Sequence, residues 1–331
     1  MRPTVRLGMI AVFALGFLVS SAKAEGKKKI VFISGVPSHG FAQHEQNAGV
    51  LLLAKCLNET MSEKIETVVL TSHLGKNGKW ANGWPTDPAV LQDASAIIIF
   101  CDGGGSHLAI PHIAELDALA GKGVGIGCIH YGVEVPKGEA GDALLRWIGG
   151  YFETFWSVNP HWKAMITSIP NHPVGNGVRP FSTNDEWYYH MRFRPNMEGV
   201  TPIIAAIPPD KTREGKDDAH NGNPEVRSGI GKSLPEIVLW VSENKDTGNR
   251  GFGCTGAHFH VNWAQDDFRK VVLNAIVWAA KMEVPAGGVE SRRPNVADLL
   301  ANLDPKKHTD KESDEGMIAK QIEEMNAPMA K

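Results

Sequence analysis

A glycine-rich stretch at residues 123–134, with the sequence GVGIGCIHYGVE, constrains the fold more than any other part of the chain. The pattern predicts a short buried strand that ends abruptly and continues into a helix, because closely spaced glycines permit the positive φ angles of a sharp turn. In open α/β sheets, ligands gather at the carboxyl ends of the strands. A strand–turn–helix corner can also hold one residue on a strained elbow. We therefore expect a functional site here, with His130 at the turn and Cys128 in the strand, facing the core.

The first 24 residues have the features of a secretory signal peptide. A basic start is followed by an apolar run at 7–19 and by Ser21-Ala-Lys-Ala24, a cleavage site of the Ala-x-Ala type. The apolar run is too short to span a bilayer comfortably. We expect a signal peptide at 1–24, export to the periplasm or the extracellular space, and no stable membrane insertion of the mature chain. An uncleaved anchor is the alternative.

Charge and cysteine content argue against two classes of protein. The formal net charge is −3, and it becomes more negative when the basic residues of the leader are removed. Without a basic block, nucleic acid is not expected as a partner. The 4 cysteines are too few and too scattered for a disulfide scaffold. Buried free thiols are the ordinary interpretation, although one disulfide remains open.

Buried-strand patterns recur along the chain with helices between them, which predicts a mostly parallel sheet covered on both faces. The expected fold is therefore a three-layer α/β sandwich. Beyond the strand in 123–134, the predicted strands are 29–34, 65–70, 96–100, 164–169, 203–207, 236–241 and 250–257, and the predicted helices are 45–59, 111–120, 141–148 and 268–281. We expect one domain at 27–285, with an exposed polar excursion at 208–235. The charged tail at 286–331 is expected to be weakly ordered or docked on the surface, with a short helix near 317–325.

Histidines concentrate where the predicted strands end, so a parallel sheet would bring several of them to one rim. These histidines are His39, His44, His107, His130, His258 and His260. An imidazole there can act as acid, base or metal ligand, because its ordinary pKa lies near neutrality. The shared topology favours His130 and His258 as catalytic groups. With His260, two residues further on, they form a candidate site for a divalent metal such as zinc. The plainer alternative leaves one of the last two histidines buried in a hydrogen bond and the other exposed.

The segment Asp185-Glu-Trp-Tyr-Tyr189 supplies carboxylates beside aromatic rings. Sugar recognition needs this combination, because rings stack on C–H faces while carboxylates accept hydroxyl protons. Glu186 is therefore a candidate catalytic group, and Asp185 and Tyr188 are candidate substrate-binding residues. The alternative is that most of the aromatic residues, Trp263 included, belong to the core.

Several motifs, taken in order, resemble the ThuA-like (trehalose utilisation) family of the class I glutamine amidotransferase-like superfold. The resemblance runs from about Lys28 to Pro285 and is carried by Ser38-His-Gly, GIGCIHYG at 125–132, WIGGYF at 147–152, NHPV at 171–174, DEWY at 185–188, GAH at 256–258 and AIVWAA at 275–280. It implies a flavodoxin-like α/β sandwich and a link to carbohydrate metabolism. It also implies that His130 stands where the superfold has its catalytic cysteine, so glutamine hydrolysis is not expected.

The expected function is that of an exported, sugar-directed enzyme, either a hydrolase or a lyase/isomerase that acts on a glycoside or an oxidised glycoside. His130, His258 and Glu186 would carry out acid/base or metal-assisted chemistry, with Asp185 binding hydroxyls or orienting a histidine. The other expected substrate-binding residues are His39, Tyr131, Tyr188, Asn262 and Trp263. A non-catalytic carbohydrate-binding module, or a structural domain tethered through its tail, remains the alternative on the same fold. The expected partner is a carbohydrate or another small molecule.

Overall fold

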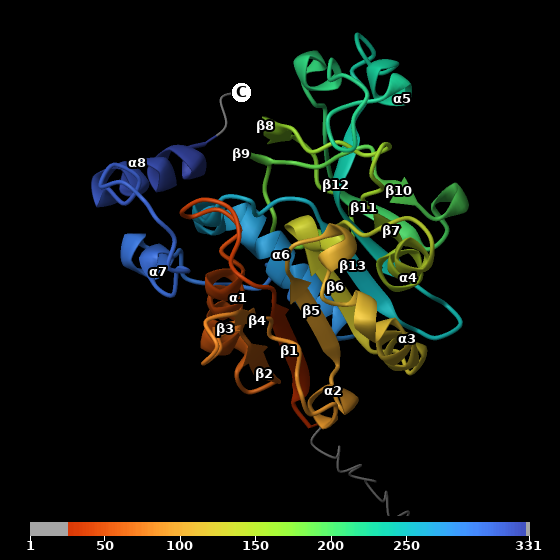
Figure 1. Ribbon diagram of the computed structural model, residues 1–331, viewed down its shortest axis with the longest axis vertical. Coiled ribbons are helices and arrows are strands. Elements are labelled where there is room, and N and C mark those ends of the chain that lie inside the picture. Colours follow the sequence, from red (N-terminus) through yellow and green to blue (C-terminus); the bar gives the residue numbers. More distant parts are fainter. Residues whose placement is uncertain (1–25, 329–331) are drawn as a thin grey trace, which may run out of the picture.

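A seven-stranded, mostly parallel sheet forms the centre of the computed structural model, which describes residues 26–328 (Figure 1). The predicted signal peptide therefore lies outside the described residues. The strand order is β11-β12-β13-β6-β5-β1-β2, and the pairs from β13 to β2 are parallel. The strands are β1 (Lys28–Ser34), β2 (Ile65–Leu70), β5 (Ala96–Phe100), β6 (Gly125–Ile129), β11 (Val200–Ala206), β12 (Glu236–Glu243) and β13 (Arg250–Cys254).

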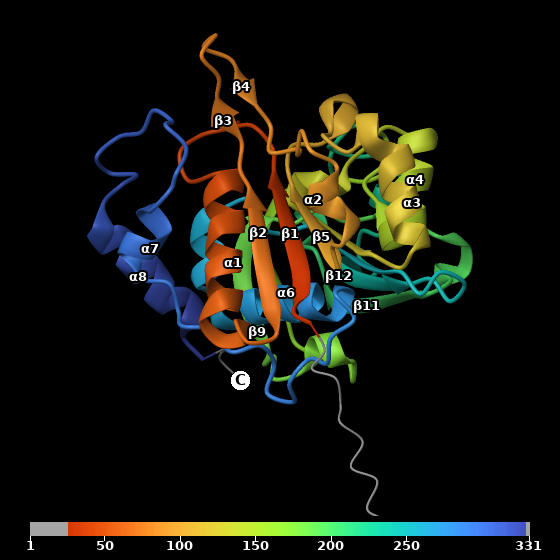
Figure 2. The same cartoon turned by 90° about the horizontal axis from the view of Figure 1, so that it is seen from below.

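Both faces of the sheet are covered, as the continuous apolar strands predict. Alternate residues of β1 enter separate cores, Ile30 and Phe32 on one face and Val31 and Ile33 on the other. Helices α1 (Gln46–Met61) and α6 (Asp266–Ala279) cover the first face, and α3 (Ile113–Gly121) and α4 (Glu139–Ile148) cover the second (Figure 2). The predicted three-layer α/β fold is confirmed.

Close packing explains the glycines of β13. A Cβ on Gly253 would lie 2.2 Å from the ring of Trp240, and one on Gly251 would lie 2.1 Å from the carbonyl oxygen of Trp147. No side chain fits at these distances, so glycine lets helix α4 and the indole of Trp240 approach the strand. Strands β12 and β11 then continue the sheet in the antiparallel sense.

A second layer of short elements sits at the carboxyl edge of the sheet. The hairpin of β8 (His161–Ile166) and β9 (Phe181–Glu186) delivers the acidic–aromatic segment to that edge. The other short elements of the structure are β3 (His73–Leu74), β4 (Trp80–Ala81), β7 (Gly150–Tyr151), β10 (Arg192–Phe193) and α5 (Pro224–Arg227). Helix α2 (Ala89–Gln92) lies at the opposite edge, just before β5 (Figure 1).

The excursion at 208–235 is largely exposed, as expected, and it is also folded. It contains α5 and a one-turn helix at Asp210–Arg213. The Arg213 side chain is 2 % exposed and pairs with Glu236 at 2.8 Å. A guanidinium that is buried with a carboxylate partner fixes the excursion against the sheet.

Residues 286–328 are docked on the domain, so of the two expectations for this segment the docked one holds for its described part. It forms α7 (Val296–Leu300) and α8 (Glu315–Asn326) beside α1 and α6 (Figure 2). Leu299 and Ile322 are buried in the core of that face. Lys55 of α1 also donates to Asp298 at 2.8 Å.

The four cysteines are free and buried. Within residues 26–328, no helix is both long and apolar enough to cross a bilayer.

Candidate functional site

Four side chains from four different elements converge at the carboxyl edge of the sheet. They are His44 in the loop after β1, His130 directly after β6, His258 after β13 and Glu186 at the end of β9. One ring nitrogen of each histidine and one oxygen of Glu186 all lie within 4.8 Å of one another. The three imidazoles are buried and Glu186 is nearly so. The parallel sheet thus brings together residues that are far apart in the sequence.

The four atoms form a closed ring of short contacts. His44 Nε2 lies 3.0 Å from His258 Nδ1 and 3.0 Å from His130 Nε2. Glu186 Oε2 lies 2.9 Å from His258 Nδ1 and 3.4 Å from His130 Nε2. Each atom therefore faces the same small volume.

The outer nitrogens of two imidazoles have acceptor partners that fix the tautomer. His130 Nδ1 lies 2.8 Å from the carbonyl oxygen of Thr255, which can only accept. His44 Nδ1 lies 2.9 Å from the Asp102 carboxylate. A neutral imidazole at either position therefore carries its proton on Nδ1 and turns its Nε2 lone pair inward. Two lone pairs at 3.0 Å repel each other unless a cation or a proton lies between them.

Burial acts against the proton at His44. It lowers the pKa of His44 to about 3, although the hydrogen bond to Asp102 works in the opposite direction. Burial would raise the pKa of Glu186, but hydrogen bonds with His130 and His258, which donate to the carboxylate when their inner nitrogens are protonated, bring that pKa well below its usual value. Near neutral pH the cluster therefore offers a neutral His44 imidazole and an ionised Glu186 carboxylate.

Backbone strain accompanies this convergence. His130 has φ 52°, at the sharp turn from β6 into the short helix His130–Val133. His39 and His44 have φ 59° and 47°. Non-glycine residues in the left-handed region cost about 1–3 kcal/mol each and persist where the surroundings hold them. The elbow expected at His130 is present.

Asp185 lies beneath the cluster and is fully buried. Its carboxylate accepts from the backbone N–H groups of Ala257 at 2.6 Å and His258 at 3.0 Å. Of the two roles expected for Asp185, the contacts match the orientation of a histidine, because they fix the backbone that carries His258.

Aromatic and polar residues surround the ring. His39 stacks on His44 with a centroid separation of 3.6 Å, and its pKa is lowered by burial. The Tyr188 hydroxyl lies 3.2 Å from His130 Nε2 and 3.4 Å from Glu186 Oε2. Tyr131 is half-buried beside His39, and burial raises its pKa to about 12. The hydroxyl of Tyr131 therefore stays protonated and available as a donor.

The folded excursion at 208–235 contributes His220, which contacts the end of the 123–134 stretch. His220 Nε2 contacts Glu134 Oε1 at 2.9 Å, and its ring stacks on Phe152. The hydrogen bond to Glu134 raises the pKa of His220. The other oxygen of Glu134 is buried and has no partner among the described residues.

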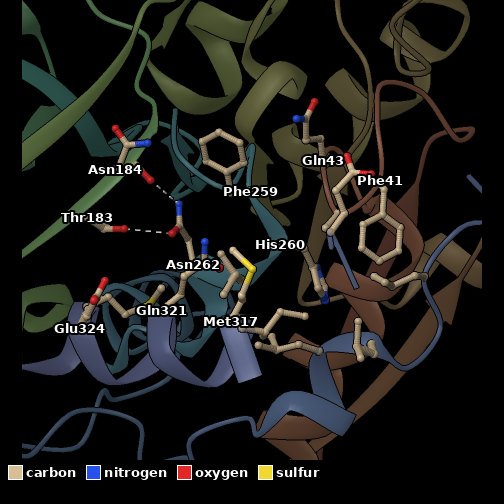
Figure 3. A pocket seen from close by; sticks show the side chains of 18 of the residues that line it. Phe41, Gln43, Thr183, Asn184, Phe259, His260, Asn262, Met317, Gln321 and Glu324 are labelled. Carbon is tan, nitrogen blue, oxygen red and sulfur yellow. Dashed lines mark hydrogen bonds between the residues drawn. The ribbon is translucent and has the colours of Figure 1, made fainter. Parts of the chain in front are cut away.

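Three residues expected in the site lie elsewhere, and these placements correct the sequence-based hypothesis. His260 is outside the converging group and lines a separate cavity of about 700 Å³ (Figure 3). Asn262 lines the same cavity, and its amide is engaged by Thr183 and Asn184. Trp263 is fully buried and stacks on Phe268, so it cannot contact a substrate. The plainer interpretation of Trp263 as a core residue is the right one.

Two important residues of this site were not assigned a role from the sequence. His44 is on the expected rim, but no spacing marks it as a ligand. Asp102 follows β5 directly and accepts from His44 and from the Gln46 amide at 2.7 Å. The available signal was its position, since β5 and β6 are neighbours with parallel carboxyl ends.

Comparisons with known proteins agree with this architecture. The sequence model of the ThuA family, described as trehalose utilisation, matches residues 33–279. A ThuA-like protein from Bacteroides uniformis superimposes with a TM-score of 0.51 at 16 % identity, over 82 % of this chain and 98 % of that chain. A ThuA-like protein from Parabacteroides merdae gives a TM-score of 0.51 at 12 % identity, over 86 % and 100 %. No curated protein matches. Because the family match covers well over half of the sequence, the chain belongs to the ThuA (trehalose utilisation) family.

Proposed function

We propose that this protein is a metal-dependent enzyme of carbohydrate metabolism, in which His44, His130 and His258 hold a divalent cation such as zinc. The observation that carries the proposal is the pair of inward lone pairs on His44 and His130, 3.0 Å apart. The partners of the outer nitrogens, Asp102 and the Thr255 carbonyl, are of the kind that orients metal-binding histidines. Family membership supports the link to carbohydrate utilisation.

The donor set fits such a metal. Imidazole nitrogens with a carboxylate oxygen suit zinc among the common divalent ions. The neighbouring atoms of the ring are 2.9–3.4 Å apart. These short contacts gather the inward-facing nitrogens around one small volume, as the ligands of a single ion require.

We assign the three imidazoles as ligands and Glu186 as the acid/base group. Three protein ligands are typical of catalytic zinc sites, which keep a position open for water or substrate. When bound, the metal would polarise a carbonyl or hydroxyl oxygen of the substrate. Glu186 is ionised and can accept a proton, and its Oε1 is held by the Asn159 amide at 3.1 Å.

The surrounding charges favour a neutral substrate. Asp102, Glu134 and Glu186 place carboxylates around the ring, and an anionic sugar would be repelled by them. Carboxylates accept hydroxyl protons and Tyr131 can donate, which matches a polyhydroxylated ligand. A glycoside or an oxidised glycoside, cleaved or rearranged by a hydrolase or a lyase/isomerase, is the proposed substrate class.

The first test is the metal content of the purified mature protein, measured by elemental mass spectrometry. We expect one metal per chain in the wild type and in His73→Ala, a variant of an exposed histidine on β3. The His44→Ala and His130→Ala variants should be metal-free while still folded. A metal-free wild type, or full metal in both variants, would reject the metal centre.

Glu186→Gln then separates catalysis from binding. If Glu186 is the acid/base group, the variant keeps its metal and binds a carbohydrate from a glycan panel, but forms no product. Loss of the metal would make Glu186 a ligand instead. Binding without product formation in the wild type would support the non-catalytic carbohydrate-binding module.

We also propose that the protein acts outside the cytoplasm, on the basis of the leader-like sequence at 1–24. Fractionation of the native host and sequencing of the mature amino terminus test this. A mature chain that begins after Ala24 is expected, and an intact leader on a cytoplasmic protein would contradict it.

A further inference from the structure

We propose that the C-terminal segment at 286–326 is part of the functional site, because Lys306 and Asp304 position the loop that carries His44. Lys306 is thus a positioning residue that acts through His44. The metal-binding readout rests on the proposed function, whereas the structural readout described below does not. The family match ends at residue 279, so this contribution comes from outside the matched region.

The loop that needs positioning is strained. Three of its non-glycine residues, His39, Ala42 and His44, have positive φ angles of 59°, 57° and 47°. A loop relaxes from such angles unless its surroundings hold it. One side is held by the segment that follows β13, since the His44 N–H donates to the His258 carbonyl at 3.0 Å and Ala42 O accepts from His260 N at 2.9 Å.

The C-terminal segment holds the other side through Glu45, the neighbour of His44. The Glu45 carboxylate accepts from the Ala42 N–H at 3.1 Å and from the Asp304 N–H at 2.8 Å. Lys306 Nζ pairs with Glu45 Oε1 at 3.1 Å, and the two side chains are 8 % and 0 % exposed. Lys306 also donates to the carbonyl oxygens of Gln43 and His44. One buried ammonium thus contacts three consecutive residues of the loop.

Asp304 adds a second link, to the first turn of α1. Its carboxylate accepts from the Asn47 amide at 2.9 Å, and the Asn47 oxygen accepts from the Ser72 N–H at 2.9 Å. All three residues are buried. The contact therefore joins the C-terminal segment to the sheet and to the helix that follows His44.

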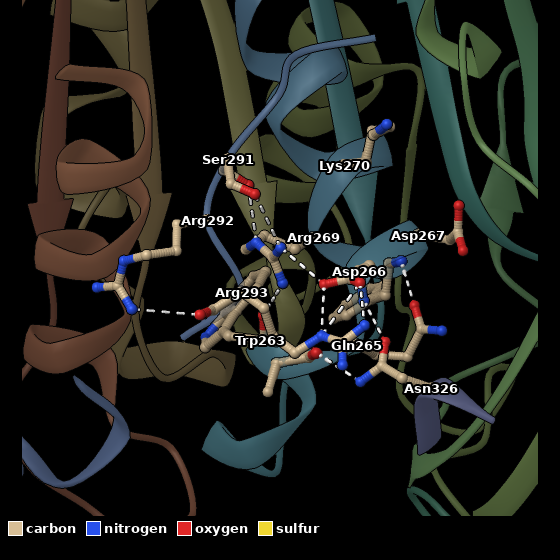
Figure 4. Close-up of polar contacts among 12 residues, drawn as sticks. Trp263, Gln265, Asp266, Asp267, Arg269, Lys270, Ser291, Arg292, Arg293 and Asn326 are labelled. Carbon is tan, nitrogen blue, oxygen red and sulfur yellow. Dashed lines mark hydrogen bonds and ion pairs between the residues drawn. The ribbon is translucent and has the colours of Figure 1, made fainter. Parts of the chain in front are cut away.

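The segment is anchored well enough to act as a support. Arg269 of α6 donates to the Ser291 hydroxyl at 2.9 Å, and Arg293 forms an ion pair with Asp266 (Figure 4). At the far end, the Asn326 amide donates to the carbonyl oxygen of Ala264 at 2.9 Å. Lys306 lies between these two anchors in the sequence.

The neighbouring cavity keeps the contact local. Met317, Gln321 and Glu324 of α8 line it on one side, and Phe41 and Gln43 of the strained loop line it on the other (Figure 3). This space separates α8 from the loop. The contacts from the C-terminal segment that fix His44 therefore come from the residues around Lys306.

The test is Co²⁺ titration of the metal-free protein, followed by visible absorption. We expect Lys306→Met to weaken Co²⁺ binding by roughly 10- to 100-fold, as for other groups that orient metal ligands, and to change the absorption band. Lys306→Arg should restore most of the affinity. Lys320→Met, at an exposed lysine of α8, should bind Co²⁺ with the wild-type affinity. Unchanged affinity and spectrum in Lys306→Met would overturn the proposal.

Two further measurements keep the outcome decisive. If Lys306→Met does not fold, the double variant Glu45→Gln/Lys306→Met removes both buried charges and takes its place. Hydrogen exchange of the peptide around residues 40–49 then tests the clamp, that is, the contacts of Asp304 and Lys306 with the His44 loop, without any metal. Faster exchange in the Lys306 variant than in Lys320→Met supports the clamp, and equal exchange rejects it. If the wild type binds no Co²⁺ but exchange is faster, the proposed metal function fails while the clamp stands.

Discussion

His258 and His260 are two residues apart and have opposite environments. His258 Nδ1 contacts both His44 and Glu186 in the cluster. His260 is equally buried, yet neither of its ring nitrogens has a partner among the described residues. Burial lowers the pKa of His260 to about 3, so it stays neutral. Burial and residue type are thus the same in the two histidines, and only the convergence of other donors distinguishes them.

The backbone explains why the two side chains diverge. Residues two apart share a face only in an extended strand. Strand β13 ends at Cys254, Ala257 has φ 88°, and a short helix begins at His260. The chain thus leaves the strand before His258 and enters a short helix at His260, so the two histidines do not belong to one regular strand, and the metal pair that their spacing predicted does not form.

The largest expected difference is in metal content. His258→Ala should abolish the proposed metal site, because it removes one of three imidazole ligands. His260→Ala should leave the metal stoichiometry unchanged. Elemental mass spectrometry of the two purified variants checks this, with circular dichroism to show that both are folded. Equal metal loss in the two variants would contradict the assignment of His258, and not His260, as a metal ligand.

The next effect concerns Trp263, which the sequence placed in the site and the structure places in the core. Trp263→Ala should lower the free energy of unfolding by about 3–5 kcal/mol, as for other buried large-to-small changes. Chemical denaturation measures this loss. Below the unfolding transition, the variant should still bind one metal per chain. If Trp263→Ala lost its metal while its free energy of unfolding stayed unchanged, Trp263 would belong to the site after all.

A smaller effect on metal binding is expected from Asp102, which contacts the proposed ligand His44. Asp102→Asn should weaken metal binding by roughly 10- to 100-fold, because the amide no longer fixes the tautomer of His44. Asp93→Asn, at an exposed carboxylate that pairs with Lys29, is the matched control and should bind like the wild type. A competition assay with a chromophoric chelator gives both constants, and equal values would remove Asp102 from the metal site.

The smallest effect is expected from a buried histidine outside the cluster. Burial lowers the pKa of His107 to about 4. The unfolded chain takes up a proton at this residue below its ordinary pKa of 6.5, while the folded chain does not, so stability falls between about pH 6.5 and pH 4. His107 should account for about 2 kcal/mol of the loss between pH 7 and pH 5.

Denaturation of His107→Gln across this pH range measures that contribution. The variant should be less stable at pH 8, because the bond from His107 to the Gly132 carbonyl is lost, but its pH profile should be flatter. His73→Gln, at an exposed position, should follow the wild-type profile. An equally steep profile in His107→Gln would contradict the assignment.

Much of the fold could be predicted because it depends on local patterns. The strands predicted at Ala96–Phe100 and Ile65–Leu70 match β5 and β2 as observed. The elbow at His130 was also predictable, since glycines flank it. The role of His44 was not, because it depends on contacts with Asp102 and His258 across 58 and 214 residues. The proposed role of the C-terminal segment was equally hidden, because it depends on Lys306, whose partners lie in the distant loop at residues 43–45.

The positive φ angles at His39, His44 and His130 have a consequence for laboratory evolution. Glycine at these positions would relieve backbone strain, so selection for heat resistance alone should enrich glycine there and remove the imidazoles. Ala42, with φ 57° and no role in the cluster, should accept the same change without loss of the site. Under selection for heat resistance and activity together, glycine should accumulate at position 42 and be absent from the three histidine positions.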